Sequence, residues 1–562
     1  MDLDTPGEIP GSCGMRLRSS RTVRGTIAAA LSLCCLLGAI APVQGAGVES
    51  QLGQVAFEVS CNRPAQASFN EAVAWLHSFE YERAEATFHG VLDHDPSCAM
   101  AYWGMAMSLW HQLWATPPSP AALARGAEYV RHAQALAPTS SRETRYVEAI
   151  GAFYSGTEKF NHRTRALAYE KAMGELHSSH PEDREASIFY ALSLLATAPP
   201  TDKTFENQLK SGALLEAVLD DTPEHPGTTH YIIHSYDYPE LAERALEAAR
   251  RYARIAPASA HANHMPSHIF TRRGLWRESI ATNLNAAAAG RAFARARGMK
   301  GRWDEELHAI SYLMYAYLQG AQDTKAREIL NDTQTIMAVE PVGIKAAYPF
   351  ASNPARFLLE RRLWNDAAAL AVLPDWFPWE DYPAAHAITY FTRALGAARM
   401  GDPEQAKAEL KMLKKLRRAL PGDASAYWRA QLEVQTNTVE AWIAHAEGRE
   451  EQALALMRSA ANLEDEVDKL PITPGEVLPA RELLADMLLE QDDLATALEE
   501  YEAVLRAAPN RFNALFGAGS AADRIGNRVK ARYYYEALLA QSELSDGMRP
   551  ALEHARDFLS AI

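Results

Sequence analysis

Basic charge is scarce in this sequence of 562 residues, which has 56 Lys and Arg against 71 Asp and Glu and a net charge of −15. A surface that binds nucleic acid needs clustered basic residues. The one basic run, KMLKKLRRAL at 411–420, is typical of the solvent-exposed face of a helix. We therefore expect no nucleic-acid partner.

Short catalytic motifs and long apolar runs are also missing. The sequence has no HExxH, no CxxC, no phosphate-binding glycine loop and no recognisable Ser/His/Asp arrangement. Beyond the first 46 residues, no stretch reaches 18 uninterrupted apolar residues, so we expect no membrane span in the mature protein. No catalytic residue is assigned, and the sequence leaves open whether the protein is an enzyme.

The N-terminal 46 residues have the pattern of a secretory signal. Four arginines between residues 16 and 24 precede TIAAALSLCCLLGAIAPVQGAG, an apolar run that ends in small residues. A lipid anchor at Cys34 or Cys35 is disfavoured because Leu33, the residue before them, is not small. We expect a signal peptide over 1–46 and a periplasmic or secreted mature protein.

Cysteine is rare, and removal of residues 1–46 would leave two of the five, Cys61 and Cys98. Two thiols in an oxidising compartment can pair. We take a Cys61–Cys98 disulfide as a hypothesis. The alternative is two buried free cysteines, which pack as small hydrophobic residues.

Helical periodicity rich in alanine dominates the rest, and it repeats. In the segment 494–539, Ala497 and Ala531 lie 34 residues apart, Pro509 follows Ala497 by twelve residues, and Gly526 ends the helix expected between them. This resembles the tetratricopeptide repeat (TPR), in which a small residue lets the two helices of a hairpin pack closely and a proline ends the pair. The same frame fits Ala84 with Pro96 and Ala245 with Pro257, and looser units surround Ala326, Ala406 and Ala453.

The resemblance implies an all-α fold, a right-handed α-solenoid of TPR-like helical hairpins curved around a concave groove. The segments CAMAYWGMAMS, HYIIHSYD, HANHMPSHIFTRRGLW and APNRFNALFGAG are similar to those of exported bacterial TPR proteins of unassigned function. We divide the chain into a signal peptide (1–46), an N-terminal segment (47–64), N-terminal hairpins (65–222), central histidine-rich repeats (223–345), further hairpins (346–470) and C-terminal repeats (471–562).

Two histidine pairs repeat with the period of the array. His230 and His234 are four residues apart, as are His264 and His268, and the second pair follows the first by 34 residues. Residues four apart lie on the same face of a helix. In the repeat frame, both pairs take the same two positions on helices that line the concave groove. Pro266 complicates this placement, because proline suits the first turn of a helix, so the second helix would begin near Pro266.

Two further histidines lie near these pairs: His261 at the entry to the second helix, and His308 in the following unit. Imidazole suits Zn, Cu, Fe or Ni, and a pair four residues apart can bind one ion from a helix face. Asp237 or another carboxylate would complete such a site. Two alternatives stay open: a groove that binds a ligand without metal, and histidines that serve packing alone.

The N-terminal repeats carry a similar pattern. His77 and His111 are 34 residues apart, and Trp103 and Trp110 lie on the same stretch of helix as His111. We take these four residues as candidates for lining the groove. The alternative for the tryptophans is the hydrophobic core, since aromatic stripes at helical spacing usually pack inside.

Three hypotheses of function follow. The first is an exported TPR scaffold that binds a peptide or protein partner in its concave groove and carries a histidine-lined metal site. The second is a metal-binding protein that uses the cluster of His230, His234, His264 and His268. The third is a metalloenzyme that uses the same cluster with an open coordination position.

Overall fold

The computed structural model describes residues 49–113, 117–136, 140–199, 202–421 and 426–561. The signal peptide predicted for residues 1–46 lies outside these ranges. The regular secondary structure within them is helical, apart from one parallel pair of two-residue strands, β1 (Arg302–Trp303) and β2 (Val339–Glu340). The predicted all-α fold is confirmed. No helix in the described ranges is long and apolar enough to cross a membrane.

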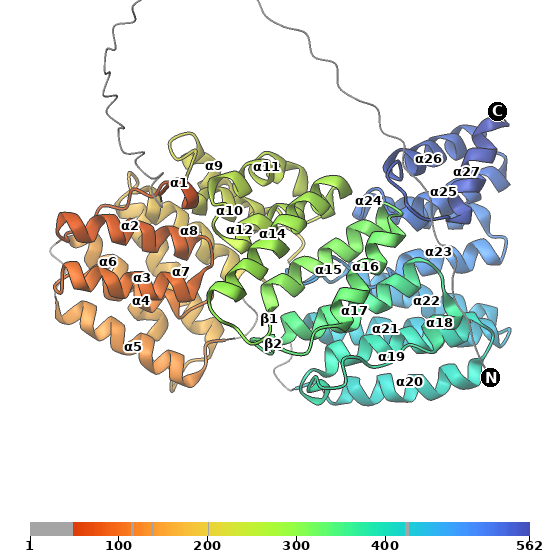
Figure 1. Cartoon of the computed structure of the whole chain (residues 1–562), viewed down its shortest axis with the longest axis horizontal. Helices are drawn as coiled ribbons and strands as arrows, with labels where there is room; N and C mark the ends of the chain where they lie inside the picture. The colour runs from red at the N-terminus through yellow and green to blue at the C-terminus, as the bar shows by residue number, and fades with distance from the viewer. Residues whose placement is uncertain (1–48, 114–116, 137–139, 200–201, 422–425, 562) are drawn as a thin grey trace, which may run out of the picture. The chain divides into compact units, whose positions relative to one another are not determined.

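The first part of the chain is a row of antiparallel helical hairpins (Figure 1). Short α1 leads into pairs of neighbouring helices: α2 packs on α3, α4 on α5, α6 on α7 and α8 on α9. The bounds are α1 Glu49–Leu52, α2 Arg63–His77, α3 Tyr81–His94, α4 Ala99–Ser108, α5 Pro120–Ala135, α6 Ser141–Tyr154, α7 His162–Ser179, α8 Arg184–Thr197 and α9 Glu206–Leu219.

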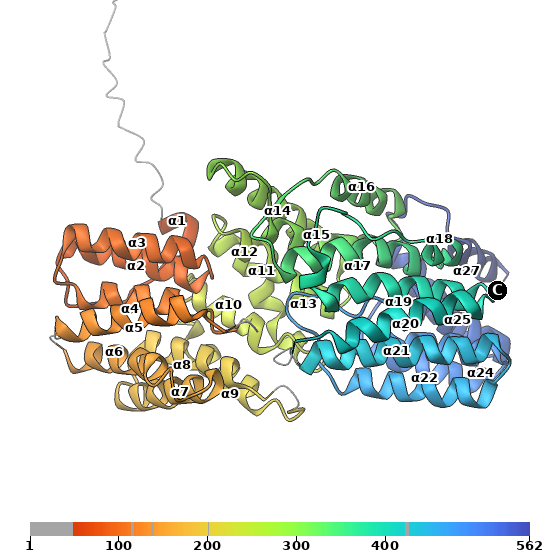
Figure 2. The ribbon, with the colours of Figure 1, turned by 90° about the horizontal axis from the view of Figure 1, so that it is seen from below.

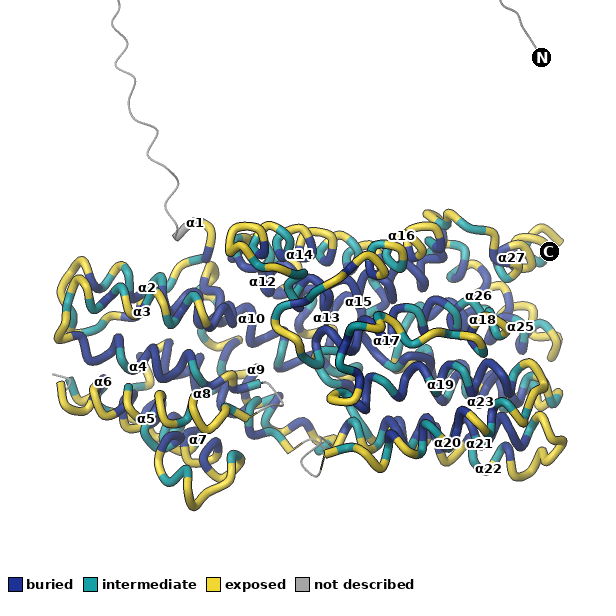
Figure 3. Tube along the Cα trace, turned by 60° about the horizontal axis from the view of Figure 1, so that its bottom comes forward, coloured by how far each residue is buried: buried dark blue, intermediate teal, exposed yellow. Residues whose placement is uncertain are grey.

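The central helices carry the histidine pairs. They are α10 Pro226–Ser235, the 3₁₀ turn η1 Ala242–Ala245, α11 Leu246–Ile255, α12 Ala260–His264, α13 Pro266–Arg272, α14 Trp276–Ala296, α15 Asp304–Gln319 and α16 Asp323–Gln334. Figure 2 shows α10 to α13 between the N-terminal hairpins and the later ones. In Figure 3, α10 and α13 are mostly dark blue, because nearly every residue of these two helices is buried.

The last part continues the array of hairpins. It comprises α17 Ile344–Glu360, α18 Trp364–Ala368, η2 Trp379–Asp381, α19 Pro383–Arg399, α20 Pro403–Arg418, α21 Ala426–Ala446, α22 Glu450–Asp465, α23 Ala480–Glu490, α24 Leu494–Ala507, α25 Phe512–Ile525, α26 Arg528–Gln541 and α27 Pro550–Ser560. Successive helices again pair, α19 with α20, α21 with α22, α23 with α24 and α25 with α26.

Small residues allow the helices of a hairpin to approach closely. Ala497 and Ala531, the two residues that define the repeat, are fully buried. Gly519 of α25 lies so close to the Tyr535 ring of α26 that a Cβ atom would come within 2.6 Å of it. Gly526 ends α25 in the left-handed region, with φ at 85°, where glycine carries no steric penalty. The repeat spacing therefore corresponds to real hairpin contacts.

Two large clusters of buried hydrophobic side chains hold the described residues together. One draws its members from residues 52 to 270, and the other from residues 307 to 555. Met265 and Ile269 of the first cluster and Leu307 of the second are sequence neighbours of the central histidines. The histidines therefore lie where the two clusters approach each other.

The sulfur atoms of Cys61 and Cys98 are 2.03 Å apart, the distance of a disulfide bond. Cys61 lies just before α2, and Cys98 is the N-cap residue of α4. The bridge therefore encloses the hairpin formed by α2 and α3.

A buried ionic network ties the C-terminal repeats to earlier helices. The Arg511 guanidinium is fully buried and donates to Glu482 at 2.8 Å, to Glu360 at 2.9 Å and to the Tyr315 hydroxyl at 2.8 Å. These partners lie on α23, α17 and α15. One cation thus balances two buried carboxylates from separate hairpins.

We predict that Arg511→Ala lowers the free energy of unfolding by about 3–5 kcal/mol, because it leaves two carboxylates buried without a counter-charge. Chemical denaturation followed by circular dichroism measures the change. Arg532→Ala is the control: Arg532 makes an exposed pair with Glu536 on the same helix and should have no measurable effect. Equal losses in the two variants would contradict this account.

Candidate metal centre

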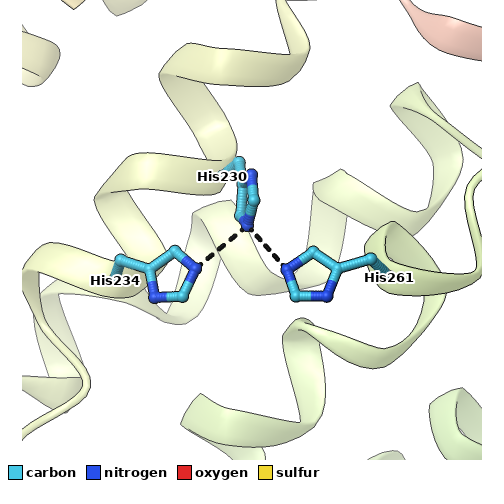
Figure 4. A group of neighbouring side chains, drawn as sticks. All are labelled: His230, His234 and His261. Atoms are coloured by element: carbon cyan, nitrogen blue, oxygen red, sulfur yellow. Dashed lines mark hydrogen bonds between the residues drawn. The ribbon is translucent and has the colours of Figure 1, made fainter. Parts of the chain in front are cut away.

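The first histidine triad consists of His230, His234 and His261. His230 and His234 lie one turn apart on α10, and His261 comes from α12. The Nε2 atom of His230 is 3.1 Å from Nε2 of His234 and 3.1 Å from Nε2 of His261 (Figure 4). Three imidazoles from two helices therefore direct their Nε2 atoms at one point.

The second triad consists of His264, His268 and His308. The Nε2 atoms of His264 and His268 are 3.1 Å apart. His308 comes from α15, and its ring centroid lies 4.2 Å from that of His264. In each triad the ligand atoms lie within 4.8 Å of one another. The ring centroids of His234 and His268 are 6.4 Å apart, so the two triads are direct neighbours.

Pro266 divides the second repeat helix without separating its histidines. As expected from the proline, α13 begins at Pro266, and α12 ends just before it at His264. Proline has no N–H to donate to the carbonyl of the preceding turn. The Met265 amide still donates to the His261 carbonyl, and the His268 amide to the Met265 carbonyl, so the chain keeps turning in the same sense. His264 and His268 therefore still face each other.

In three of these rings, the Nδ1 atom, which points away from the other rings of its triad, is hydrogen-bonded to a fixed acceptor. Nδ1 of His230 is 2.6 Å from the His77 carbonyl oxygen, Nδ1 of His264 is 2.7 Å from Oδ1 of Asn283, and Nδ1 of His268 is 2.9 Å from Oδ2 of Asp237. A carbonyl or carboxylate oxygen can only accept, so each Nδ1 must carry the hydrogen. In the neutral ring, Nε2 is then left with a free lone pair.

Asn283 is oriented by a second bond, because its amide nitrogen donates to the Ser279 carbonyl at 2.7 Å. The amide oxygen consequently points at His264. Two Nε2 lone pairs, those of His264 and His268, then face each other at 3.1 Å. This contact is repulsive unless a cation lies between the nitrogens. Tetrahedral coordination with metal–nitrogen bonds of 2.0–2.1 Å places neighbouring nitrogens about 3.3 Å apart, close to this spacing.

The six imidazoles are neutral at physiological pH. Burial lowers the pKa of all six, and repulsion from a neighbouring imidazole adds to this effect for all but His268. The pKa of His234 falls to about 3. Metal binding requires an unprotonated nitrogen, so the triads are ready to bind a metal without first losing protons.

Asp237 lies behind His268 rather than among the metal-facing atoms. Its carboxylate accepts from Nδ1 of His268, from the Arg272 guanidinium at 2.9 Å and from Nζ of Lys469 at 2.9 Å. Burial alone would raise the pKa of Asp237, but Lys469 and Arg272 hold it well below its usual range. The expectation that Asp237 completes the metal site is therefore replaced by a role in orienting His268.

A third group, His77, Glu185 and His225, is already satisfied by its own hydrogen bonds. His77 and His225 each donate from Nε2 to one oxygen of Glu185, at 2.9 and 2.8 Å. Nδ1 of His77 accepts from the Tyr231 hydroxyl, and Nδ1 of His225 accepts from the Thr228 amide. These rings have no lone pair left for a metal, so we assign the group to support of the first triad.

The link between this group and the first triad is the end of a helix. His77 is the last residue of α2, where carbonyl groups have no partner within the helix, and its carbonyl accepts from His230. The C-terminal end of a helix is also the negative end of its dipole and favours a nearby cation. The predicted groove residue His77 thus contributes to the site through its backbone.

The other predicted groove residues are not members of the triads. Trp103 and Trp110 are each 1% exposed and pack in the N-terminal hydrophobic cluster, Trp110 against Phe153 with ring centroids 3.8 Å apart. We therefore assign both tryptophans to the core. His111 is exposed and stacks on Tyr81 at a centroid distance of 3.9 Å.

Four of the six histidines, His234, His261, His268 and His308, line a cavity of about 580 Å³. The rest of the wall comes from distant parts of the chain, including Phe79, Ile344 and Ile472. The segment that contains Ile472 is held nearby, because the Tyr312 hydroxyl lies 3.0 Å from the carbonyl oxygens of Pro471 and Thr473. The triads are therefore reached from this cavity.

Sequence reasoning missed the groups that orient the rings. Asn283 lies 19 residues after His264, and Lys469 lies 232 residues after Asp237, its partner. Neither residue stands in a motif or at a repeat spacing relative to the histidines. Lys469 is buried, and burial lowers its pKa to about 8. No signal in the sequence marks these residues, since their roles arise from contacts between hairpins.

No protein-family model matches this sequence, and no curated protein matches it. Solved structures to which the chain is similar include the Naa15/Naa10 complex bound to HypK-THB, at 14% identity and a TM-score of 0.23, covering 89% of this chain and 75% of that one. Another is the human IFIT1 dimer with PPP-AAAA, at 12% identity and a TM-score of 0.35, covering 89% and 99%. A third is the TPR domain of P58(IPK), at 15% identity and a TM-score of 0.20, covering 67% and 99%. Scores this low carry no argument about the function of this chain.

We predict that acid destabilises the metal-free protein partly through His234. In the unfolded chain its pKa is near 6.5, and in the fold burial lowers it to about 3, with Asp237 and Lys469 as charged neighbours and His268 as a titratable one. Between these values the unfolded state binds more protons, so the free energy of unfolding falls as the pH drops below 6.5.

The variant His234→Phe keeps a ring but cannot be protonated. The free energy of unfolding is measured for the variant and for the wild type at pH 5.5 and at pH 4.5. The difference, variant minus wild type, should be roughly 1 kcal/mol larger at pH 4.5 than at pH 5.5. Chemical denaturation in the presence of a chelator measures it. A difference that does not change with pH would contradict the neutral, buried state of His234.

Proposed function

We propose that this protein is an exported helical-repeat protein that binds transition-metal ions through its two histidine triads. The observation that carries the proposal is the pair His264 and His268. Their Nδ1 atoms are committed to Asn283 and Asp237, and their Nε2 lone pairs face each other at 3.1 Å. A bound metal ion would turn this repulsive contact into two coordination bonds.

The donor set favours copper or zinc among the four candidate metals. Each triad offers three imidazole nitrogens, and neither includes a carboxylate. Non-haem iron sites commonly combine two histidines with one carboxylate, whereas all-imidazole sites suit zinc and copper. Three protein ligands also leave a coordination position open, as in catalytic zinc sites.

Binding of a peptide or protein partner in a concave groove stays a prediction, as do the signal peptide and the periplasmic or secreted location. The helical-repeat architecture is compatible with such a partner. Four of the six histidines, however, line a cavity of about 580 Å³, which is the size of a small-molecule site. We therefore place metal binding first.

We predict two equivalents of copper or zinc per chain after loading and gel filtration, measured by elemental analysis of protein purified without an affinity tag. His261→Ala should lose one equivalent, because it opens the first triad alone. His308→Ala should lose the other, and the double variant should lose both.

The matched control is His132→Ala on α5, which replaces an exposed histidine outside the triads and should keep two equivalents. Circular dichroism checks that each variant keeps its helical content. Metal-free wild-type protein that cannot be loaded would contradict the proposal, as would unchanged stoichiometry in the double variant.

A further inference from the structure

Beyond metal binding, the charge of the metal-loaded triads indicates which kind of ligand the cavity would take. Six neutral imidazoles would leave two divalent ions with their full positive charge. Among the described residues that line the cavity, the one carboxylate is Asp381. A buried charge without a counter-charge is costly, so an occupied centre of this kind needs an anion from outside the chain.

The charged groups around the triads are already paired with one another. Lys345 lines the cavity and forms an ion pair with Glu305. Behind His268, the Asp237 carboxylate binds both Lys469 and Arg272, and Glu476 also acts on these two cations. Asp237 is therefore already committed to cations of the chain and does not balance the charge of a bound metal ion.

Most of the remaining wall is apolar. It includes the side chains of Leu195, Ala196, Met265, Ile344, Leu420 and Ile472. Phe79 covers the first triad, with its ring centroid 4.5 Å from that of His230 and 5.5 Å from that of His234. An inorganic anion would satisfy the charge but would leave this apolar surface in contact with water.

We propose that the cavity binds a small organic anion, with its oxygen on the metal-loaded triads and its apolar body against this wall. The proposal rests on the proposed metal-binding function. The open coordination position of each three-histidine triad would take the anionic oxygen. The volume of about 580 Å³ suits a molecule the size of a substituted aromatic acid.

The test uses the whole protein loaded with cobalt(II), whose visible absorption changes when a ligand binds. Three probes are titrated: acetate, 3-phenylpropionate and the neutral 3-phenylpropanol. We expect 3-phenylpropionate to bind at least ten-fold more tightly than acetate, because a buried phenyl group adds hydrophobic affinity to the same carboxylate. The neutral alcohol should leave the spectrum unchanged.

A substitution in the cavity wall tests ligand binding in the cavity independently of metal binding. Ala196→Trp on α8 fills the cavity and should remove the preference for 3-phenylpropionate without changing cobalt stoichiometry or acetate binding. Leu420→Trp fills the same cavity from another hairpin and serves if the first variant does not fold. The matched control is Ala503→Trp, in the wall of a second cavity of about 480 Å³, which should keep the preference.

The outcomes distinguish the two proposals. Equal affinities for acetate and 3-phenylpropionate in cobalt-loaded protein would overturn the cavity proposal and leave metal binding intact. A preference that survives both cavity-filling variants would overturn it as well, since the phenyl group would then lie elsewhere. Failure to take up cobalt would overturn both.

Discussion

Two unprotonated imidazole nitrogens face each other 3.1 Å apart at the centre of this protein, and the architecture around them maintains that contact. Asn283 and Asp237 hold the far nitrogens of His264 and His268, and Asp237 is held in turn by Lys469 and Arg272. Asn283, Asp237 and Lys469 come from three different helices or segments. The site is thus a product of the hairpins that meet there, and the groups behind the rings fix which nitrogen of each ring faces its neighbour.

The same contacts connect the site to the stability of the fold. Lys469 belongs to the non-helical segment between α22 and α23, and Tyr312, which also contacts His268, holds that segment through two of its carbonyl groups. His77 joins the end of α2 to the first triad through its own carbonyl. Occupancy of the triads is therefore expected to stabilise the junction between the two hydrophobic clusters, because a ligand that binds only the native state shifts the folding equilibrium.

The helical hairpins were largely predictable from the sequence, because the contacts within a hairpin join residues that are close together in the chain. The 34-residue spacing of Ala497 and Ala531, with Gly526 between them, predicted a hairpin whose helices pack through small residues, and the structure has that hairpin. Pro266 predicted the start of a helix, and α13 begins there. The prediction for Trp103 and Trp110 was less specific, since helical spacing does not distinguish a groove face from a core face, and both are buried.

The sequence by itself determined which residue types repeat and which of them share a helix face, since helical periodicity depends on neighbours in the chain. It therefore placed His230 beside His234 and His264 beside His268. Only the tertiary structure decided how the six histidines divide into triads, with His261 joining the first and His308 the second. It also decided that Asp237 orients a ring and that a cavity opens on the triads, because these depend on contacts between residues up to 232 positions apart.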